Sequence, residues 1–451
     1  MPRTVVIDVV GLERAHLGAA TPQLSSFVQE PRAVDPVTPA VTCTAQATYL
    51  TGQLPSAHGI VANGWYFRDL NEIWLWRQSN RLVESEKVWH KARRRDPSFT
   101  VANTFWWYAM ATEADLTMTP RPLYLADGVK VPDCYSDPPE LRTELSERIG
   151  NFPLFEFWGP RTSIASSRWI AEAARHIETS HEPGLQLVYL PHLDYVLQRE
   201  GPAGSIDKDL AEIDEVAGQL IDFFRERGLR VLLVSEYAIT AVSEPVHINR
   251  VLREHGFLAV KEDLGREYLD PGRSRAFAVS DHQIAHVYVH ERSDIAAVAS
   301  LLAGIRGVGR VLDDEGKRAA GLDHSRAGEL VALAEPGCWF TYYFWLDDGR
   351  APDYARMVDI HNKPGYDPCE LFVDPGLGAA SLRAAWTLAR KAAGFRYKME
   401  LTPLDARLVR GSHGLPSPGP MLASSEPGLL AKQRYSATEV CQVILDHVSG
   451  D

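Results

Sequence analysis

The stretch over residues 37–64 carries the strongest sign of chemistry in this chain, because a threonine lies at the expected start of a helix. We expect residues 40–44 to form a strand-like segment that passes into a short helix over residues 45–50. Free backbone N–H groups and the positive end of the helix dipole favour an anion at such a start. The hydroxyl of Thr42 is therefore a candidate nucleophile or phosphate contact. The alternative is that Thr42 or Thr44 simply caps the helix, a role in which threonine is common.

Three carboxylates fall at or just after the ends of three apolar strands. Asp8 interrupts TVVIDVVGL, Asp194 follows LQLVYL, and Glu236 follows the apolar part of LRVLLVSEYAIT. A buried carboxylate without a partner is costly, and ligands of open α/β sheets gather at the carboxyl ends of strands. For Asp8 alone, a turn position after the strand is the alternative interpretation. Three carboxylates in equivalent places predict a cation site with hard oxygen ligands, joined by one or two histidines.

His413 is the histidine whose local sequence points most clearly to a ligand. It lies late in the chain, between glycines in the segment GSHG. Glycines permit an unusual backbone and a close approach to a ligand. The alternative for any single histidine is a structural residue held by hydrogen bonds.

Composition sets limits on the class of protein. At 451 residues the chain exceeds the usual single domain, so we expect one large domain with an inserted cap, or two domains. The net charge of −12 argues against nonspecific binding to a nucleic acid duplex, although a bound metal could supply a local positive field for a phosphate. The 5 cysteines are scattered without a CxxC pair, which is typical of reduced thiols in a cytoplasm.

The N-terminal segment and the apolar runs predict a cytoplasmic protein without a membrane span. The run in MPRTVVIDVVGL is short and is broken by Asp8, unlike that of a secretory signal. No run approaches the roughly 18 apolar residues of a membrane helix. Elsewhere, helical spacing predicts helices over 166–178, 205–228 and 381–394, and the prolines over 112–165 predict loops.

The order of these motifs resembles the alkaline phosphatase superfamily, in its nucleotide pyrophosphatase/phosphodiesterase and phosphonoacetate hydrolase branch. The resemblance rests on Asp8 in VVIDVVG, on Thr42, on TGQLPSAHGI over 51–60, and on Asn63 at the expected spacing. It runs over most of the chain, and this first block is specific. It implies that Thr42 is the nucleophile and that Asn63 contacts the phosphoryl oxygens.

Two metal-ligand positions depart from the pattern of this family. Gln198 and Tyr237 stand where the family has histidines, whereas the other ligand positions are matched. The resemblance implies that the metals are bound by Thr42 together with four matched ligands: Asp8, Asp194, Glu236 and His413. Further candidates that could rebuild the shell are Gln198, Tyr237, His192, His282 and His361.

The fold implied by the resemblance is a three-layer α/β/α sandwich with a mostly parallel central sheet and an inserted cap. The expected core covers residues 1–261 and 356–451, and the expected cap covers residues 262–355. The oligomeric state is left open by the sequence.

The function implied is metal-dependent hydrolysis of a small phosphate ester, such as a phosphodiester, a pyrophosphate, a monoester or a phosphonate. Thr42 would attack phosphorus, and water would hydrolyse the phosphothreonine. One or two divalent ions (Zn²⁺, Mn²⁺ or Mg²⁺) would assist, and the loss of two imidazoles favours Mn²⁺ or Mg²⁺ over Zn²⁺. The alternative is a metal-poor or catalytically inactive binding protein on the same scaffold.

Overall fold

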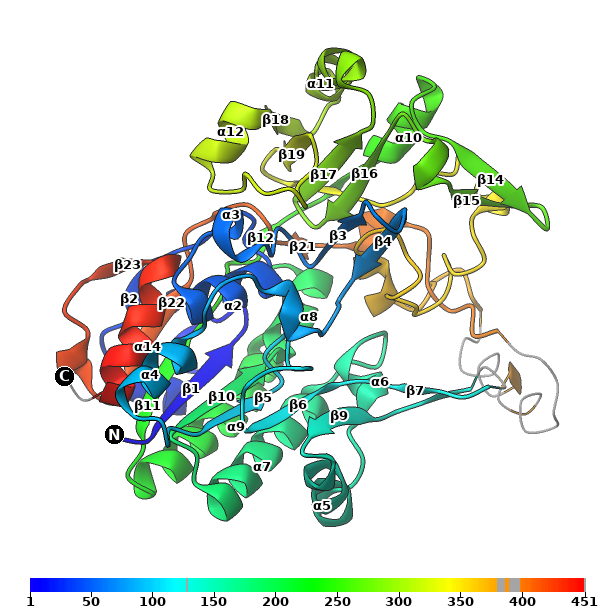
Figure 1. Ribbon diagram of the computed structural model, residues 1–451. Coiled ribbons are helices and arrows are strands. Elements are labelled where there is room, and N and C mark those ends of the chain that lie inside the picture. The colour runs from blue at the N-terminus through cyan, green and yellow to red at the C-terminus, as the bar shows by residue number, and fades with distance from the viewer. Residues whose placement is uncertain (127–128, 379–385, 388, 390–397, 450–451) are drawn as a thin grey trace.

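A large central sheet, covered by helices on both faces, forms the body of the protein (Figure 1). The computed structural model describes residues 1–126, 129–378, 386–387, 389 and 398–449. Helices α7 and α9 pack together over one face, and α14 packs on α2 and α4 over the other. The α/β architecture with a mostly parallel sheet confirms the fold class expected from the sequence.

The central sheet has 9 strands in the order β23-β2-β22-β11-β1-β10-β5-β6-β9. In chain order its strands are β1 (Thr4–Val9), β2 (Arg32–Asp35), β5 (Val101–Thr104), β6 (Leu116–Pro120), β9 (Cys134–Asp137), β10 (Leu185–Leu190), β11 (Arg230–Val234), β22 (Met421–Ser424) and β23 (Arg434–Ser436). Strand β1 pairs in parallel with β10 and β11, whereas β22 and β9 add antiparallel pairs. Every residue of β1 and β10 is buried, as apolar strands covered on both faces must be.

The helices around this sheet differ from the expected ones at two places. They are α1 (Pro22–Phe27), α2 (Thr42–Thr51), α3 (Pro55–His58), α4 (Val88–Arg95), α5 (Pro139–Ile149), α6 (Leu154–Phe157), α7 (Ile164–His181), α8 (His192–Glu200), α9 (Asp207–Glu226) and α14 (Val440–Ser449). The strand expected over 40–44 is wrong, because burial of every residue in α2 overrides the strand preference of its β-branched residues. The loops expected over 112–165 are also wrong, since the prolines there begin α5 rather than interrupt it. The helix expected over 381–394 falls largely outside the described residues.

A second group of elements stands beside the carboxyl edge of the sheet, at the top of Figure 1. It contains β12 (Thr240–Ala241), β13 (Glu244–Val246), α10 (Ile248–Glu254), β14 (Val260–Asp263), β15 (Arg266–Leu269), β16 (Ala276–Asp281), β17 (Ile284–Val289), α11 (Ile295–Ala303), β18 (Val308–Leu312), α12 (Asp314–Ala319), β19 (Leu330–Ala334) and β20 (Cys338–Phe340). Strands β16, β17, β19 and β18 form an antiparallel sheet with its own apolar core. The hairpin of β3 (Gly64–Phe67) and β4 (Glu72–Leu75) contacts this sheet through β16.

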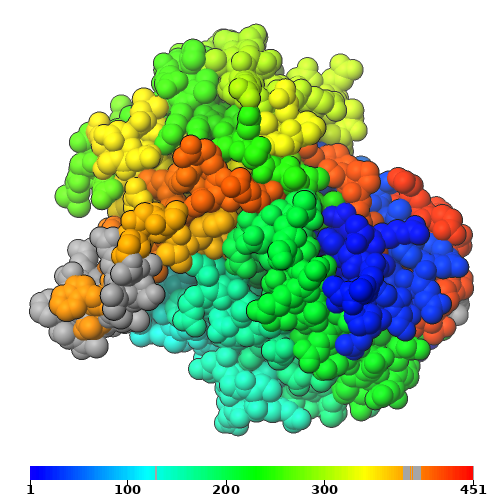
Figure 2. All heavy atoms as spheres, turned by 180° about the vertical axis from the view of Figure 1, so that it is seen from behind, coloured from blue at the N-terminus to red at the C-terminus, as the bar shows by residue number. Residues whose placement is uncertain are grey.

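Three further short strands complete the fold. Strands β7 (Leu123–Tyr124) and β8 (Lys130–Val131) form a small ribbon, and β21 (Gly411–Ser412) pairs with β12. From behind, an orange part of the chain lies below the green and yellow residues at the top and above the green and cyan residues (Figure 2). Among the described helices, none has both the length and the apolar character that a membrane crossing requires.

The strand register places the acidic residues at one edge. Asp8 lies opposite Tyr189 of β10 and Val234 of β11 in the parallel ladder. Strand β10 then leads into α8, whose first turn carries Asp194, and Glu236 follows the end of β11. The fold therefore gathers the three carboxylates at the carboxyl edge of the sheet.

Candidate active site

Helix α2 presents Thr42 at its first position. Val41 is the N-cap residue, its backbone is extended, and no side chain caps the helix. Thr42 is 3% exposed, and its hydroxyl oxygen lies 2.9 Å from the phenol oxygen of Tyr237. The hydroxyl of Thr44 is buried without a hydrogen-bond partner. The interpretation of Thr42 or Thr44 as the helix cap is therefore wrong, and the Thr42 hydroxyl faces a second polar group instead.

Tyr237 connects Thr42 to Asp194. Its phenol donates to Asp194 Oδ1 at 3.3 Å, which leaves the phenol oxygen to accept from the Thr42 hydroxyl at 2.9 Å. The Tyr237 ring stacks on His413, with ring centroids 3.7 Å apart. Burial raises the pKa of Asp194 to about 7 and raises the pKa of Tyr237 well above its ordinary value. The phenol thus stays protonated at neutral pH, whereas Asp194 can gain or lose a proton there.

Gln198 holds the second oxygen of Asp194. It lies one turn later on α8, and its Nε2 donates to Asp194 Oδ2 at 2.9 Å. Its own Oε1 accepts from the Tyr366 hydroxyl at 2.9 Å. Both oxygens of Asp194 and the amide oxygen of Gln198 therefore have hydrogen-bond partners.

Gln46 lies between the carboxyl groups of Asp8 and Glu236. It follows Thr42 by one turn on α2, and its Nε2 lies 2.6 Å from Glu236 Oε1 and 3.4 Å from Asp8 Oδ2. Its Oε1 accepts from the backbone N–H of Trp107 at 2.7 Å, which fixes the orientation of the amide. Burial raises the pKa of both carboxyl groups, because each charge would be removed from water.

The buried acidic groups lack a compensating cationic side chain. Within the described part of the chain, no lysine or arginine forms an ion pair with Asp8, Asp194, Glu236 or Asp281. Asp194 pairs with His413, and Asp281 pairs with His282. Asp8 Oδ1 and Glu236 Oε2 are buried without any hydrogen-bond partner. Such oxygens suit a hard divalent cation. The donor set therefore fits one cation at Asp8 and Glu236.

Replacing Gln46 with leucine should destabilise the protein in the absence of added metal. The change removes the amide donor to two buried carboxyl groups and leaves the Trp107 N–H without its acceptor. We expect the free energy of unfolding in urea to fall by about 1–3 kcal/mol. In the comparison variant Gln46→Glu, which keeps an acceptor for Trp107, added Mn²⁺ should restore stability. Unchanged unfolding of Gln46→Leu would show that this amide has no such role.

Asn63 connects the start of α2 to the hairpin of β16 and β17. Its Oδ1 accepts from the Cys43 N–H at 3.0 Å. Its backbone N–H and its Nδ2 donate to the two oxygens of Asp281, at 2.8 and 3.1 Å. The contact of Asn63 with a phosphoryl oxygen stays a prediction, because the structure shows the amide bound within the protein.

His282 reaches the site from the turn of that hairpin. Its backbone is in the left-handed region, with φ 62°, a conformation that a residue other than glycine rarely adopts. Its Nδ1 lies 2.7 Å from Asp281 Oδ1, and its Nε2 is buried without a hydrogen-bond partner. Its ring centroid lies 3.6 Å from that of His413. The contact with Asp281 places the proton on Nδ1, so Nε2 presents a lone pair.

His413 is positioned by the glycines on either side of it. A Cβ on Gly411 would lie 2.1 Å from the backbone oxygen of Leu197, and Gly414 has φ 117°. The glycine at 411 therefore allows a close approach to helix α8, whereas the sequence predicted an approach to a ligand. His413 Nδ1 donates to the backbone oxygen of Ala40 at 2.8 Å, and Nε2 lies 3.7 Å from Asp194 Oδ1. Burial lowers the pKa of His413 well below its usual value, so the ring is neutral.

Most of the residues singled out in the sequence lie together. The structure brings Thr42, Asp8, Asp194, Gln198, Glu236, Tyr237, His282 and His413 to the carboxyl edge of the sheet. His361 instead lies near Lys130 and Asp359, and His192 faces α9. Sequence reasoning missed Gln46 and Tyr366. Gln46 could have been found from its position one helical turn after Thr42, which places the two residues on the same face of the helix.

The family model described as type I phosphodiesterase / nucleotide pyrophosphatase matches residues 4–367. The chain therefore belongs to the type I phosphodiesterase / nucleotide pyrophosphatase family, whose fold is that of phosphoester hydrolases. Among curated proteins, the comparison finds no match.

Solved structures share the fold at low sequence identity. Human ectonucleotide pyrophosphatase / phosphodiesterase 5 is 14% identical, with a TM-score of 0.59 over 99% of this chain and 95% of that one. The murine protein of the same name, in an inactive form bound to AMP, is 13% identical, with a TM-score of 0.59 over 100% and 95% of the two chains. Phosphonoacetate hydrolase from Sinorhizobium meliloti, in complex with phosphonoformate, is 14% identical, with a TM-score of 0.59 over 99% and 96%.

Proposed function

We propose that the protein hydrolyses a small phosphate ester, of the phosphodiester or pyrophosphate class, through Thr42 as nucleophile. The observation that supports this most directly is the hydrogen-bonded series from Thr42 through Tyr237 to Asp194. It gives a weakly acidic hydroxyl a route to a base whose pKa lies at about 7. Family membership supports the reaction class, and the AMP and phosphonate ligands of the structural neighbours support a small substrate.

The first step forms a covalent phosphothreonine. Thr42 Oγ1 attacks phosphorus while the bond from phosphorus to the leaving oxygen breaks, and that oxygen takes the electron pair. The proton of Thr42 passes to the phenol oxygen of Tyr237, and the phenol passes its own proton to Asp194 Oδ1. The leaving oxygen gains a proton from solvent.

The second step regenerates the threonine. Water attacks phosphorus, the bond from phosphorus to Thr42 Oγ1 breaks, and the proton held on Asp194 returns to Thr42 through Tyr237. The proton lost by the water stays with the phosphate product or the solvent. The sum of the two steps consumes one water and leaves each side chain as it began.

Asp8 and Glu236 would hold a divalent cation in this proposal, because their unpartnered oxygens fit one. When bound, the cation would stabilise the negative charge of the phosphoryl group. The positive end of the dipole of α2 contributes to the same charge stabilisation at Thr42. Gln46, which donates to both carboxyl groups, would have to give up these contacts when the ion binds.

We also propose that residues 262–355 act as the cap over this site, on a core of residues 1–261 and 356–451. The side chains of the site are closed off from solvent: Thr42 is 3%, Asp194 8% and His282 2% exposed. A substrate can therefore reach Thr42 only if a covering segment moves. His282, which lies inside the proposed cap and contacts His413, marks where the two parts meet.

Hydrolysis of a substrate panel, with metal analysis, tests this function. The purified protein would be assayed on a chromogenic phosphodiester, a phosphomonoester, a nucleotide pyrophosphate and a phosphonate, after chelation and after return of Mn²⁺, Mg²⁺ or Zn²⁺. We expect turnover of the diester or pyrophosphate to fall on chelation and to return with Mn²⁺ or Mg²⁺ better than with Zn²⁺. Zinc bound stoichiometrically at Asp8 and Glu236 would contradict the preference for a harder ion.

A binding protein without turnover is the second candidate. It is favoured by one observation: Gln46 and Tyr237 already donate to the buried carboxyl groups that a catalytic metal would neutralise. In that case every substrate of the panel would remain intact in the presence of each metal, while a nucleotide or phosphonate still bound.

A further inference from the structure

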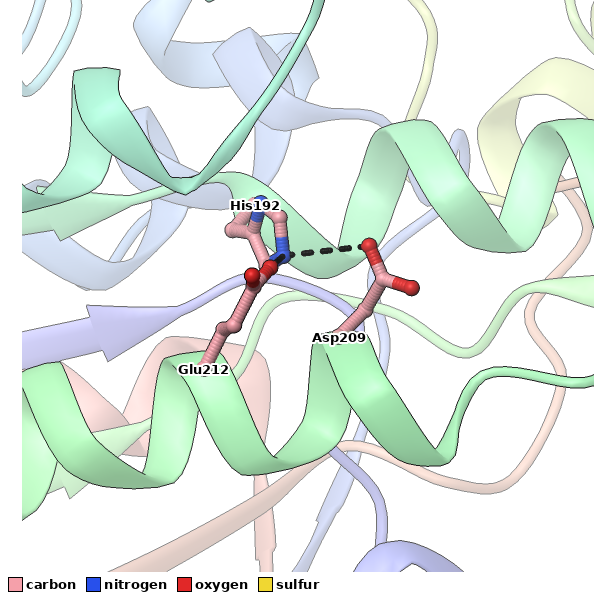
Figure 3. A group of neighbouring side chains, drawn as sticks. All are labelled: His192, Asp209 and Glu212. Carbon is pink, nitrogen blue, oxygen red and sulfur yellow. Dashed lines mark ion pairs between the residues drawn. The ribbon is translucent and has the colours of Figure 1, made fainter.

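His192, Asp209 and Glu212 form a cluster between α8 and α9 (Figure 3). His192 is the first residue of α8, and Asp209 and Glu212 lie one turn apart near the start of α9. Their shared helix face directs both carboxylates towards the imidazole. His192 is buried, whereas the two carboxylate side chains are 21% and 28% exposed. The cluster is thus closed on the protein side and reachable from solvent on the other.

The distances within the cluster suit a tetrahedral ion. His192 Nε2 lies 3.3 Å from Asp209 Oδ1 and 3.6 Å from Glu212 Oε2. All three ligand atoms lie within 4.8 Å of one another, which no other three histidine, cysteine or acidic groups achieve in the described part of the chain. Ligands held at about 2.1 Å from a tetrahedral zinc lie about 3.4 Å apart. The two nitrogen-to-oxygen distances therefore match those around a tetrahedral zinc ion.

The imidazole provides independent support. His192 is 3% exposed, and both of its ring nitrogens are buried without a hydrogen-bond partner of good geometry. Nδ1 loses its hydrogen bond to water and gains none in return, and Nε2 has only the two carboxylates beside it. Its Nε2 is aimed between the two carboxylates (Figure 3). Two cationic side chains lie near the carboxylates. Lys208 is 83% exposed and lies 3.6 Å from the other carboxylate oxygen of Glu212, Oε1. The contact with His192 lowers the pKa of Asp209, and the charge of Arg199 lowers it further.

We propose that His192, Asp209 and Glu212 bind a Zn²⁺ ion that clamps α8 to α9, with water as the fourth ligand. One imidazole and two carboxylates match the nitrogen and oxygen ligands that zinc takes. Asp194 lies on the same first turn of α8 as His192, and Gln198 lies one turn further. The ion thus fixes the helix that positions the proposed proton acceptor. This site is separate from the cation expected at Asp8 and Glu236.

Zinc titration of the full chain tests the clamp without any assay of activity. Bound Zn²⁺ would be counted by elemental mass spectrometry after exchange into metal-free buffer, and Tm would be followed with added Zn²⁺. We expect the wild-type protein to hold Zn²⁺ and to gain Tm, and we expect the double variant Asp209→Asn with Glu212→Gln to hold one Zn²⁺ fewer. Its affinity for that ion should fall by about 100-fold or more.

Asp222→Asn is the matched control, because it makes the same chemical change at an exposed position of α9. It should keep the wild-type zinc count. A wild-type protein with no zinc and no rise in Tm overturns the proposal and leaves a plain ion pair of His192 with the two carboxylates. A double variant with the wild-type zinc count and affinity also overturns it. If the double variant does not fold, the single change His192→Asn gives the same comparison.

Discussion

Replacing Thr42 with alanine should lower kcat/KM for the best phosphate ester by about 10⁴-fold or more. The alanine variant has no oxygen that could form the covalent intermediate, while its methyl group still fills part of the same buried space. The variant should keep the wild-type fold, since Thr42 makes one side-chain hydrogen bond, to Tyr237, and does not cap α2. Steady-state kinetics on the substrate that the panel identifies would measure the loss.

Thr44→Ala is the control for that variant. Thr44 lies on the same helix, is fully buried, and its hydroxyl has no hydrogen-bond partner. It should retain the wild-type kcat/KM within about threefold, because a small buried change of this kind acts mainly on stability. Equal loss in the two variants would mean that α2 is sensitive to any change, and a Thr42→Ala enzyme with wild-type rates would remove Thr42 as the nucleophile.

Replacing Tyr237 with phenylalanine should lower kcat by about 10²- to 10⁴-fold. The change deletes the oxygen that lies between Thr42 and Asp194, at 2.9 and 3.3 Å, but keeps the ring that stacks on His413. KM should change little, because the phenol has no assigned contact with the substrate. The split between kcat and KM, measured over substrate concentrations from below KM to saturation, separates a lost proton route from weaker binding.

Tyr49→Phe is the control for this second variant. The Tyr49 hydroxyl donates to the backbone oxygen of Ser235 at 2.8 Å, next to Glu236 in sequence, and it touches no part of the proton route. It should lose about 1 kcal/mol of stability and keep its kcat. A Tyr237→Phe enzyme as fast as the wild type would show that Thr42 loses its proton by another route.

The strand-end carboxylates could be predicted from the sequence because their positions depend on local patterns. Apolar runs of Val, Ile and Leu identify parallel strands, and the edge at which their ends meet follows from the fold class. Asp8, Asp194 and Glu236 therefore come together as expected. The predicted start of α2 was wrong because strand propensity is a weak signal where burial is complete.

The remainder of the site depends on contacts between distant segments, which local patterns do not contain. His282 comes from a hairpin turn and meets His413 only because β16 and β17 pack beside β21 and the sheet edge. Tyr366 reaches Gln198 in the same way. His192 and His361 were also candidate ligands, yet His192 contacts α9 and His361 lies near Lys130. The sequence alone does not show which way a histidine ring points.

Trapping the covalent intermediate tests the central claim most directly. The wild-type protein would be mixed with excess substrate, quenched in acid within one turnover, digested, and mapped by mass spectrometry. We predict a phosphoryl adduct on Thr42, formed together with a burst of leaving group and absent from Thr42→Ala. Rapid turnover with no burst and no adduct on Thr42 would contradict the account, because water would then attack the substrate directly.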